Sequence, residues 1–359
     1  MMFDASLLPG PRTEGWRHGK ISQLADLPSF SQHWSVGDDL DSGHGRLLFA
    51  ADGLRMSQDM RSKCHLAPKM VHAEDVHAML MNNKTVPQLD IFLGRSDDVT
   101  LDFSSLHGSL PLQLNITLED ASTSSISFHG AAADASLWLR INIQIAHGAS
   151  LKFLQHDGAA SGHRLFDMQV TQSAQSSFAF LSLSHGGRYV RDEITCRLAS
   201  NCKADLFAGH HLQSGRHRDL RFRVDHLGMQ STSNQDVRCV VHDRAVSGFD
   251  GLIHVSEAGA QTEAYQESKV VLMEDGALHH GKPELEIFQD DVVCSHGAAI
   301  GQLDKDALFY LMSRGIAQDD ARDMLLEAFF SGLVESATPF MGHVIPSNED
   351  MLHLARGAA

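Results

Sequence analysis

The feature that most constrains this chain is a strict alternation of apolar and polar residues at 136–145, SLWLRINIQI. Leucine and isoleucine occupy every second position from Leu137 to Ile145, and mostly polar side chains stand between them. Successive side chains of a β-strand point to opposite faces, so the pattern predicts a strand with one buried face. We therefore expect the body of the chain to be built from strands.

Short apolar runs of the same kind recur along the chain. They lie at 151–154, 178–183, 220–224, 237–241, 252–255 and 270–273. Several belong to a comparable phrase of small and polar residues: HGASLKFL (147–154), QSAQSSFAFL (172–181), LASNCKADLF (198–207) and EAGAQTEAYQ (257–266). Degenerate repetition of short strands with tight corners favours an all-β solenoid, in which each coil buries its inner face on the next. A β-sandwich or jelly roll would give the same alternation and remains an alternative at this point.

The apolar period changes from 2 to about 3.6 close to residue 300, which predicts a helical C-terminal part. Asp304 is a suitable N-cap for a helix over 305–313, and Gly315 is a suitable stop. These limits divide the chain into an N-terminal lead at 1–45, partly helical, a β body at 46–300 and a helical domain at 301–359.

A second helix is predicted from about Asp319. Its apolar stripe has helical spacing and consists of Ala321, Met324, Leu325, Ala328, Phe329, Gly332 and Leu333. Leu326 and Phe330 fall outside this stripe, on the opposite face. Two interpretations follow: the helix is wedged between two layers, or Leu326 and Phe330 form an exposed apolar pair that docks a partner protein.

Composition excludes several classes of function. The chain has 29 Lys and Arg against 45 Asp and Glu, a formal charge of −16, which argues against nucleic acid and anionic membrane surfaces as partners. No signal peptide and no membrane-spanning stretch is expected from the sequence. The five cysteines are scattered and never spaced C-x-x-C, which indicates reduced thiols and a cytoplasmic location.

Two further patterns come close to known binding motifs but lack residues or spacings that those motifs require. Residues 276–283, GALHHGKP, nearly form a phosphate-binding loop, but Pro283 replaces the magnesium-binding Ser or Thr and a strand pattern follows. Cys196 and Cys202, with the histidine pair 210–211 downstream, match no zinc spacing. Nucleophile elbows and H-E-x-x-H motifs are absent, so acyl transfer and metallohydrolysis find no support.

Cys294-Ser295-His296 is the one thiol–imidazole pair with a defined spacing near the change of period. In a strand, positions i and i+2 share a face, so the Cys294 thiol and the His296 imidazole emerge side by side. Thiolate and neutral imidazole are ligands that iron and zinc favour. The pair could equally be a structural cysteine beside a solvated histidine.

The residues around this pair carry a family resemblance. The stretch from Pro283 to Ile316, PELEIFQDDVVCSHGAAIGQLDKDALFYLMSRGI, resembles the C-terminal signature of the SufD branch of the SufB/SufD family of iron–sulfur cluster assembly proteins. The match continues downstream to Phe329. Upstream it includes the phrases Phe249-x-Gly251 and Thr262-x-Ala264-x-Gln266, and a weak echo near the N-terminus at 11–17. The Cys-Ser-His-Gly phrase favours SufD over SufB, which carries a Glu-rich variant there.

The resemblance implies a right-handed parallel β-helix with helical ends. It also implies a non-catalytic scaffold subunit that pairs with a SufB-like subunit, or with itself in isolation, and receives a SufC-like ATPase on its C-terminal helices. His296, with Cys294 beside it, is implied as a transient ligand of the nascent cluster at the subunit interface. We assign the ATPase contact to helical residues at about 304–334, of which the candidates are Phe309, Tyr310, Arg314, Leu326 and Phe330.

The chain departs from the family in one respect, and two questions stay open. The lead before the β body is shorter than usual in the family, so an N-terminal helical domain is expected to be reduced or missing. No stable cofactor is expected on the chain, and the sequence does not identify a flavin site or the stoichiometry of a complex. The alternatives are a stand-alone solenoid or cupin-like metal-dependent enzyme and a purely structural subunit with an inert His296.

Overall fold

The computed structural model of this 359-residue chain describes most of the sequence between Gly45 and Val344. The described residues are 35–36, 45–50, 53–70, 85–130, 135–157, 162–213, 215–344, 354 and 356. The N-terminal lead predicted at 1–45 lies almost wholly outside these residues.

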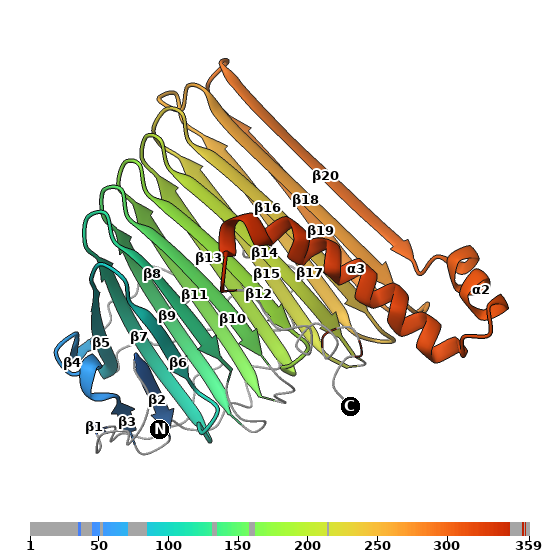
Figure 1. Cartoon of the computed structure of the whole chain (residues 1–359), viewed down its shortest axis with the longest axis horizontal. Helices are drawn as coiled ribbons and strands as arrows, with labels where there is room; N and C mark the ends of the chain where they lie inside the picture. Colours follow the sequence, from blue (N-terminus) through green and yellow to red (C-terminus); the bar gives the residue numbers. More distant parts are fainter. Residues whose placement is uncertain are drawn as a thin grey trace.

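Among the described residues, two long sheets make up the body (Figure 1). The first has eleven strands in the order β1 (Ser35–Val36), β3 (Gly53–Met56), β2 (Arg46–Ala50), β6 (Asp98–Asp102), β8 (Thr123–His129), β10 (Ser150–Asp157), β12 (Ser177–Ser184), β14 (Lys203–Leu212), β16 (Thr232–Val241), β18 (Thr262–Leu272) and β20 (Val292–Gln302). The second has nine strands in the order β19 (Leu278–Ile287), β17 (Val246–Val255), β15 (His217–His226), β13 (Tyr189–Leu198), β11 (His163–Gln172), β9 (Ser136–Ile145), β7 (Ser109–Leu118), β5 (Thr85–Leu93) and β4 (Cys64–Met70). A short 3₁₀ helix, η3 (Gln58–Met60), follows β3.

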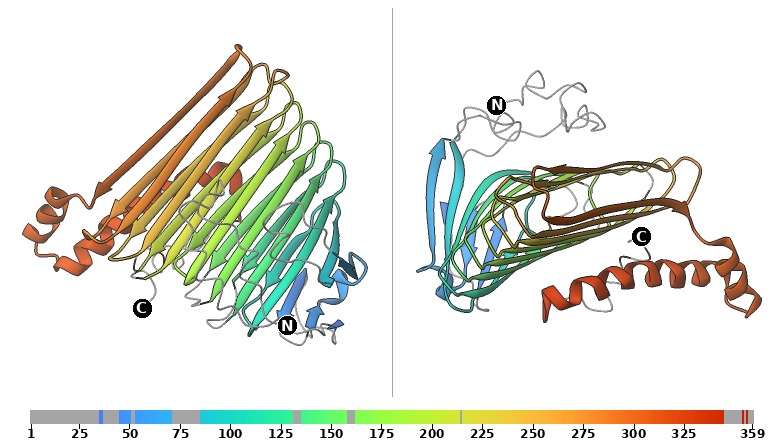
Figure 2. Two further views of the ribbon diagram at one scale, coloured as in Figure 1. Left: turned by 180° about the vertical axis from the view of Figure 1, so that it is seen from behind. Right: turned by 90° about the horizontal axis from the view of Figure 1, so that it is seen from above.

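The sheets are the two walls of a parallel β-helix. From β5 onward, consecutive strands alternate between the sheets, and each strand pairs in parallel with the strand two places away in the chain. Antiparallel pairs occur at the N-terminal end, between β2 and β3 and between β4 and β5. The view along the coil in Figure 2 shows the walls closing around an elongated interior. The solenoid prediction is confirmed, and the sandwich alternative is wrong because its strands would pair mainly antiparallel.

The small-polar phrases of the sequence form one corner of the coil. A residue with left-handed backbone stands there in each successive coil, and these residues are Ala121, Gly148, Gln175, Asn201, Gln230 and Gln261. Each donates its backbone N–H to a carbonyl of the next coil, as Gln175 does to Ser200 and Asn201 does to Met229. The offset between paired strands varies from 25 positions at Gln88–Gln113 to 32 at Ser247–His279, which explains the uneven repeat.

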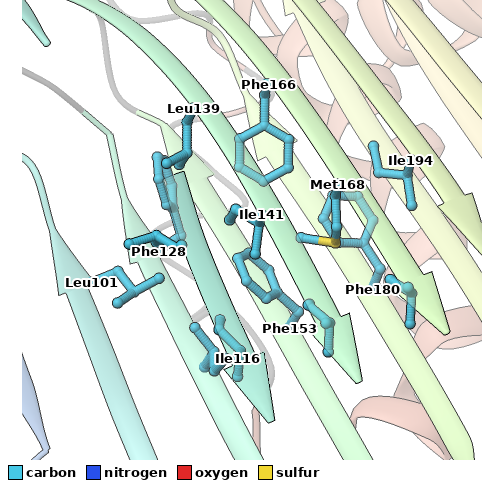
Figure 3. Close-up of a cluster of buried hydrophobic side chains, with 14 of the residues drawn as sticks. Leu101, Ile116, Phe128, Leu139, Ile141, Phe153, Phe166, Met168, Phe180 and Ile194 are labelled. Carbon is cyan, nitrogen blue, oxygen red and sulfur yellow. The ribbon is translucent and has the colours of Figure 1, made fainter. Parts of the chain in front are cut away.

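The apolar face predicted at 136–145 lies inside the coil, where Leu139, Ile141 and Ile143 are fully buried. Phenylalanines from both walls meet these residues and stack along the axis, as Figure 3 shows for Phe128, Phe153, Phe166 and Phe180. Successive ring centroids lie about 6 Å apart in edge-on or tilted contacts. Burial of this cluster, which extends from Leu47 to Phe249, stabilises the coils that it lines.

Two helices follow the last strand in the described part of the chain up to Val344. In α2 (Lys305–Ser313) the Asp304 carboxylate accepts hydrogen bonds from the backbone N–H groups of Asp306 and Ala307, and Gly315 after the helix has a φ of 88°. Both signals were predicted. The longer helix α3 (Gln318–Met341) runs back across the outer face of β12, β14 and β16 (Figures 1 and 2). None of the described helices is long and apolar enough to cross a membrane.

Candidate functional site

The candidate site lies at the C-terminal end of the β-helix. β19 and β20 are the terminal strands of their sheets, so within the described residues one backbone edge of each has no neighbouring strand. Figure 1 shows β20 along the margin of the molecule, beyond β18. An open edge presents backbone donors and acceptors that can pair with a strand of another chain. The signature residues therefore stand at a surface suited to a partner.

Cys294 and His296 lie on one face of β20, as their spacing predicts. In the parallel ladder, Cys294 is the Cα partner of Ala264 and His296 is the Cα partner of Gln266. Ala264 is fully buried in a small apolar cluster against which Cys294 packs, so this face is directed to the inside of the coil. The thiol and the imidazole thus follow the inner wall of the last coil.

The two side chains differ in their surroundings. Cys294 is half-buried because it packs against the apolar cluster. His296 is exposed, and no further strand follows β20 in its sheet among the described residues. Burial raises the pKa of the Cys294 thiol, and a backbone hydrogen bond from Ala264 works in the opposite direction. The thiol is therefore neutral in the isolated chain at neutral pH. A thiol ligates a metal only after it has lost this proton.

Two ligands are too few to hold a metal cluster. No group of three or more His, Cys, Asp or Glu side chains with metal-binding geometry occurs in the part of the chain that the structure describes. Cys294 and His296 can supply one soft and one intermediate ligand. Any cluster bound there needs its remaining ligands from outside the residues that the structure describes.

Apolar side chains are exposed along both terminal strands of the coil. Val293 and Ile300 on β20 are each more than half exposed, and so is Phe288 just beyond β19. Leu278 and Ile287 of β19 are also exposed. Large apolar side chains gathered along two open strand edges are typical of a protein–protein contact.

The helices carry the second set of predicted contacts, and α2 presents part of it to solvent. Phe309 is 72 % exposed and Tyr310 is 55 % exposed. The Arg314 guanidinium lies over the Tyr310 ring at 5.2 Å from its centroid and donates to the phenol oxygen at 3.1 Å. Phe309, Tyr310 and Arg314 therefore form one accessible surface, with a fixed cation above an aromatic ring.

The prediction that Leu326 and Phe330 form an exposed docking pair is wrong. Both are buried, together with Leu333, Ala337 and Met341, against the outer face of the β-helix. The outer face under α3 is itself apolar and is formed by Ala179, Leu181, Leu183, Phe207 and Val240. The apolar sheet face, and not the helix pattern alone, determines which face of α3 is buried. As a result Met324, which belongs to the predicted core stripe, is 47 % exposed.

Arg238 of β16 is a residue of this region that the sequence patterns did not identify. Its guanidinium donates to the backbone carbonyl of Phe329 at 2.6 Å, and it reaches α3 at Gly332, where a Cβ would lie 2.3 Å from Nη1. A lone arginine on a strand gives no local signal. The glycine inside an otherwise helical pattern was the available hint of a close approach.

The structure also shows where Cys196 and the histidine pair 210–211 lie. Cys196 lies inside the coil on β13, and His210 and His211 point to opposite faces of β14. Nε2 of His210 forms a hydrogen bond with Ser182 inside the coil. Nδ1 of His211 forms a hydrogen bond with the Leu354 carbonyl outside it. Burial raises the pKa of Cys196 and lowers that of His210. These residues are structural, as the spacing indicated.

Comparison with known proteins places most of the chain in one family. Residues 104–329, more than half of the chain, match the family model described as the SUF system FeS cluster assembly SufBD core domain. The match covers most of the β-helix, including Cys294 and His296, and both C-terminal helices as far as Phe329.

Three curated relatives agree with this match. The chain is 32 % identical over 214 residues to Protein ABCI7, chloroplastic, of Arabidopsis thaliana, covering 58 % of this chain and 45 % of the relative. It is 29 % identical over 202 residues to an iron–sulfur cluster assembly SufBD family protein of Synechocystis, covering 56 % and 44 %. It is 39 % identical over 118 residues to the iron–sulfur cluster assembly protein SufD of Escherichia coli, covering 33 % and 28 %. The aligned segments thus span less than half the length of each of these relatives.

Proposed function

The chain belongs to the SufBD family of iron–sulfur cluster assembly proteins, and from that membership we propose that it is a SufD-type scaffold subunit without catalytic activity of its own. A SufB-like subunit would pair with its open β-helix end, and a SufC-like ATPase would bind its C-terminal helices. In isolation the same open end would pair with a second copy. The nascent cluster is the cargo of this assembly rather than a resident cofactor.

The observation that carries the proposal is the position of Cys294 and His296. They are a thiol and an imidazole, both suitable as metal ligands, on the inner wall of the last coil at an open strand edge. The described residues bring no third ligand to them. Within the described residues such a site is incomplete, and a partner strand that pairs with β20 would contribute the remaining ligands.

The exposed surface on α2 supports the ATPase contact. Phe309 and Tyr310 are a large apolar and aromatic surface on a nine-residue helix, and Arg314 adds a fixed positive charge beside them. Aromatic residues with an arginine are the composition enriched at energetically dominant interface positions. α2 lies between β20 and α3 in the chain, so movement of a bound ATPase would act directly on the strand that carries His296.

Co-expression with a SufB-like and a SufC-like chain tests this proposal. We expect the three chains to co-purify as one complex that assembles an iron–sulfur cluster when supplied with iron and a sulfur source. Recovery of this chain alone, with a tightly bound metal and substrate turnover of its own, would instead support the metal-dependent enzyme. A cytoplasmic location remains a prediction, since one relative is named as chloroplastic.

A further inference from the structure

A column of three side chains runs along the inner wall of the last coils and ends at His296. Gln235 of β16 is the Cα partner of Gln266 of β18, and Gln266 is the Cα partner of His296 of β20. Partners in a parallel ladder lie about 4.8 Å apart and project in the same direction. The two carboxamides and the imidazole are therefore successive steps of one column, parallel to the axis of the coil.

Both glutamines are buried and their amide groups have no partner in the described structure. Gln235 is fully buried and Gln266 is 3 % exposed. For each residue, neither Oε1 nor Nε2 has a hydrogen-bond partner. Buried polar atoms without partners are rare and costly in folded proteins, so two adjacent carboxamides in this state point to an interaction that another arrangement of the column completes.

The opposite wall leaves room for the Gln266 amide. Gly251 of β17 faces the inside of the coil, and a Cβ there would lie 2.2 Å from Nε2 of Gln266. The missing side chain thus creates the space in which the carboxamide lies and can turn. Gly251 and Gln266 are both part of the sequence signature, whereas the function proposed above uses neither of them.

We propose that Gln266 is a positioning residue for His296. Rotation of its side chain brings Oε1 to one ring N–H of His296 as acceptor, while Nε2–H donates to Oε1 of Gln235. An N–H held by a carbonyl oxygen fixes the tautomer of a neutral imidazole and leaves the lone pair on the other ring nitrogen. That lone pair is the one that a metal requires, so the column prepares His296 as a ligand.

The consequence for cluster assembly rests on the function proposed above, but the hydrogen bond itself can be measured on the chain alone. With ¹⁵N-labelled histidine, the ring nitrogen shifts report which nitrogen carries the proton, and the His296 signals are those that disappear in His296→Gln. In the full-length wild-type chain, above the pH at which imidazole protonates, we expect one tautomer to dominate. Gln266→Met keeps the length of the side chain and lacks its polar atoms, so both tautomers should then become populated.

Three variants make the result specific. Gln266→Glu retains an acceptor oxygen and should restore the single tautomer. Gln235→Leu removes the second step of the column and should give an intermediate distribution. Ser268→Ala changes a buried side chain on the same face of β18, in register with Ala298 rather than His296, and should leave the His296 signals unchanged. Gln266→Leu serves in place of Gln266→Met should the latter fail to fold.

The inference is overturned if the His296 tautomer distribution of folded Gln266→Met equals that of wild type, both in the chain alone and in its complex. In the complex, loss of a hydrogen bond behind a metal-binding histidine typically lowers metal affinity or activity by roughly 10–100-fold, and we expect cluster formation to fall within that range. Should the tautomer change while the complex assembles no cluster even with the wild-type chain, the positioning role stands and the proposed function fails.

Discussion

The Arg238 guanidinium of β16 donates to the backbone carbonyl of Phe329 in α3 at 2.6 Å and lies 5.7 Å from the centroid of the Phe329 ring. This contact fastens the C-terminal helix to the outer wall of the β-helix. Gly332, one turn further along α3, gives the arginine its space. The contact also determines which face of α3 packs against the sheet. The residues on the opposite face of α3 remain accessible to a partner protein.

Replacement of Arg238 by Met should loosen α3. A hydrogen bond to a charged group contributes about 1.5–3 kcal/mol, so we expect the free energy of unfolding to fall by roughly that amount. Backbone amides of α3 should exchange with deuterium faster than in wild type, while those of β9 and β11 should not. Arg244→Met, at a side chain 78 % exposed, is the control. Equal α3 exchange in the two variants would contradict the anchoring role.

Truncation should lower the stability of the chain at Phe330 but hardly change it at Phe309. Phe330 is fully buried in the cluster between α3 and the sheet, so Phe330→Ala should cost about 3–5 kcal/mol in chemical denaturation. Phe309 is 72 % exposed, so Phe309→Ala should change stability by less than about 0.5 kcal/mol. Only Phe309→Ala should weaken ATPase binding without destabilising the chain. Unchanged ATPase affinity in Phe309→Ala would remove this residue from the proposed contact.

Asp205 should make stability depend on pH. Burial raises its pKa from 3.8 to about 7, so between these values the folded chain holds a proton that the unfolded chain has lost. The free energy of unfolding should therefore fall as pH rises from about 4 to about 7, by at most about 4 kcal/mol from this residue. Asp205→Asn should flatten the profile measured by denaturation over this range, and Asp290→Asn, at an exposed residue, is the control for the substitution itself. A wild-type profile that Asp205→Asn leaves unchanged would refute this assignment.

A charge on the open end should block pairing. Ile300 is 55 % exposed on the edge strand β20, so Ile300→Lys should leave the fold intact and weaken association with a SufB-like subunit by at least about tenfold. Sedimentation measures both the heterodimer and any homodimer. Phe92→Lys, at a residue 54 % exposed near the other end of the coil, is the matched control. Equal losses in the two variants would argue against a contact at β20.

Much of the fold could be predicted because its signals are local. Alternation at Leu137–Ile145, the small residues at the corners and the Asp304 cap each specify their own structure within a few positions. The face of α3 could not be predicted from the helix alone, since it has apolar residues on both sides. The missing information lies in 178–183, FAFLSL, where apolar side chains on both faces of a strand indicate that both faces are covered.

The site could be predicted only in part, for a similar reason. The i, i+2 spacing placed Cys294 and His296 on one face, and that holds in β20. That this face lines an open end depends on β20 being the last strand of its sheet, which no short pattern reveals. The column of Gln235, Gln266 and His296 depends on register between residues about thirty positions apart, so it emerges only once the coils are stacked.

The most direct test of the central claim is cluster formation by the reconstituted complex with His296→Ala in this chain, followed by the visible absorbance of the iron–sulfur chromophore. His129→Ala, at an exposed histidine on β8, is the control for the substitution itself. We predict that both complexes assemble with the stoichiometry of wild type, and that cluster formation falls at least about tenfold only with His296→Ala. Cluster formation at the wild-type rate in an intact His296→Ala complex would contradict the assignment of His296 as a ligand of the nascent cluster.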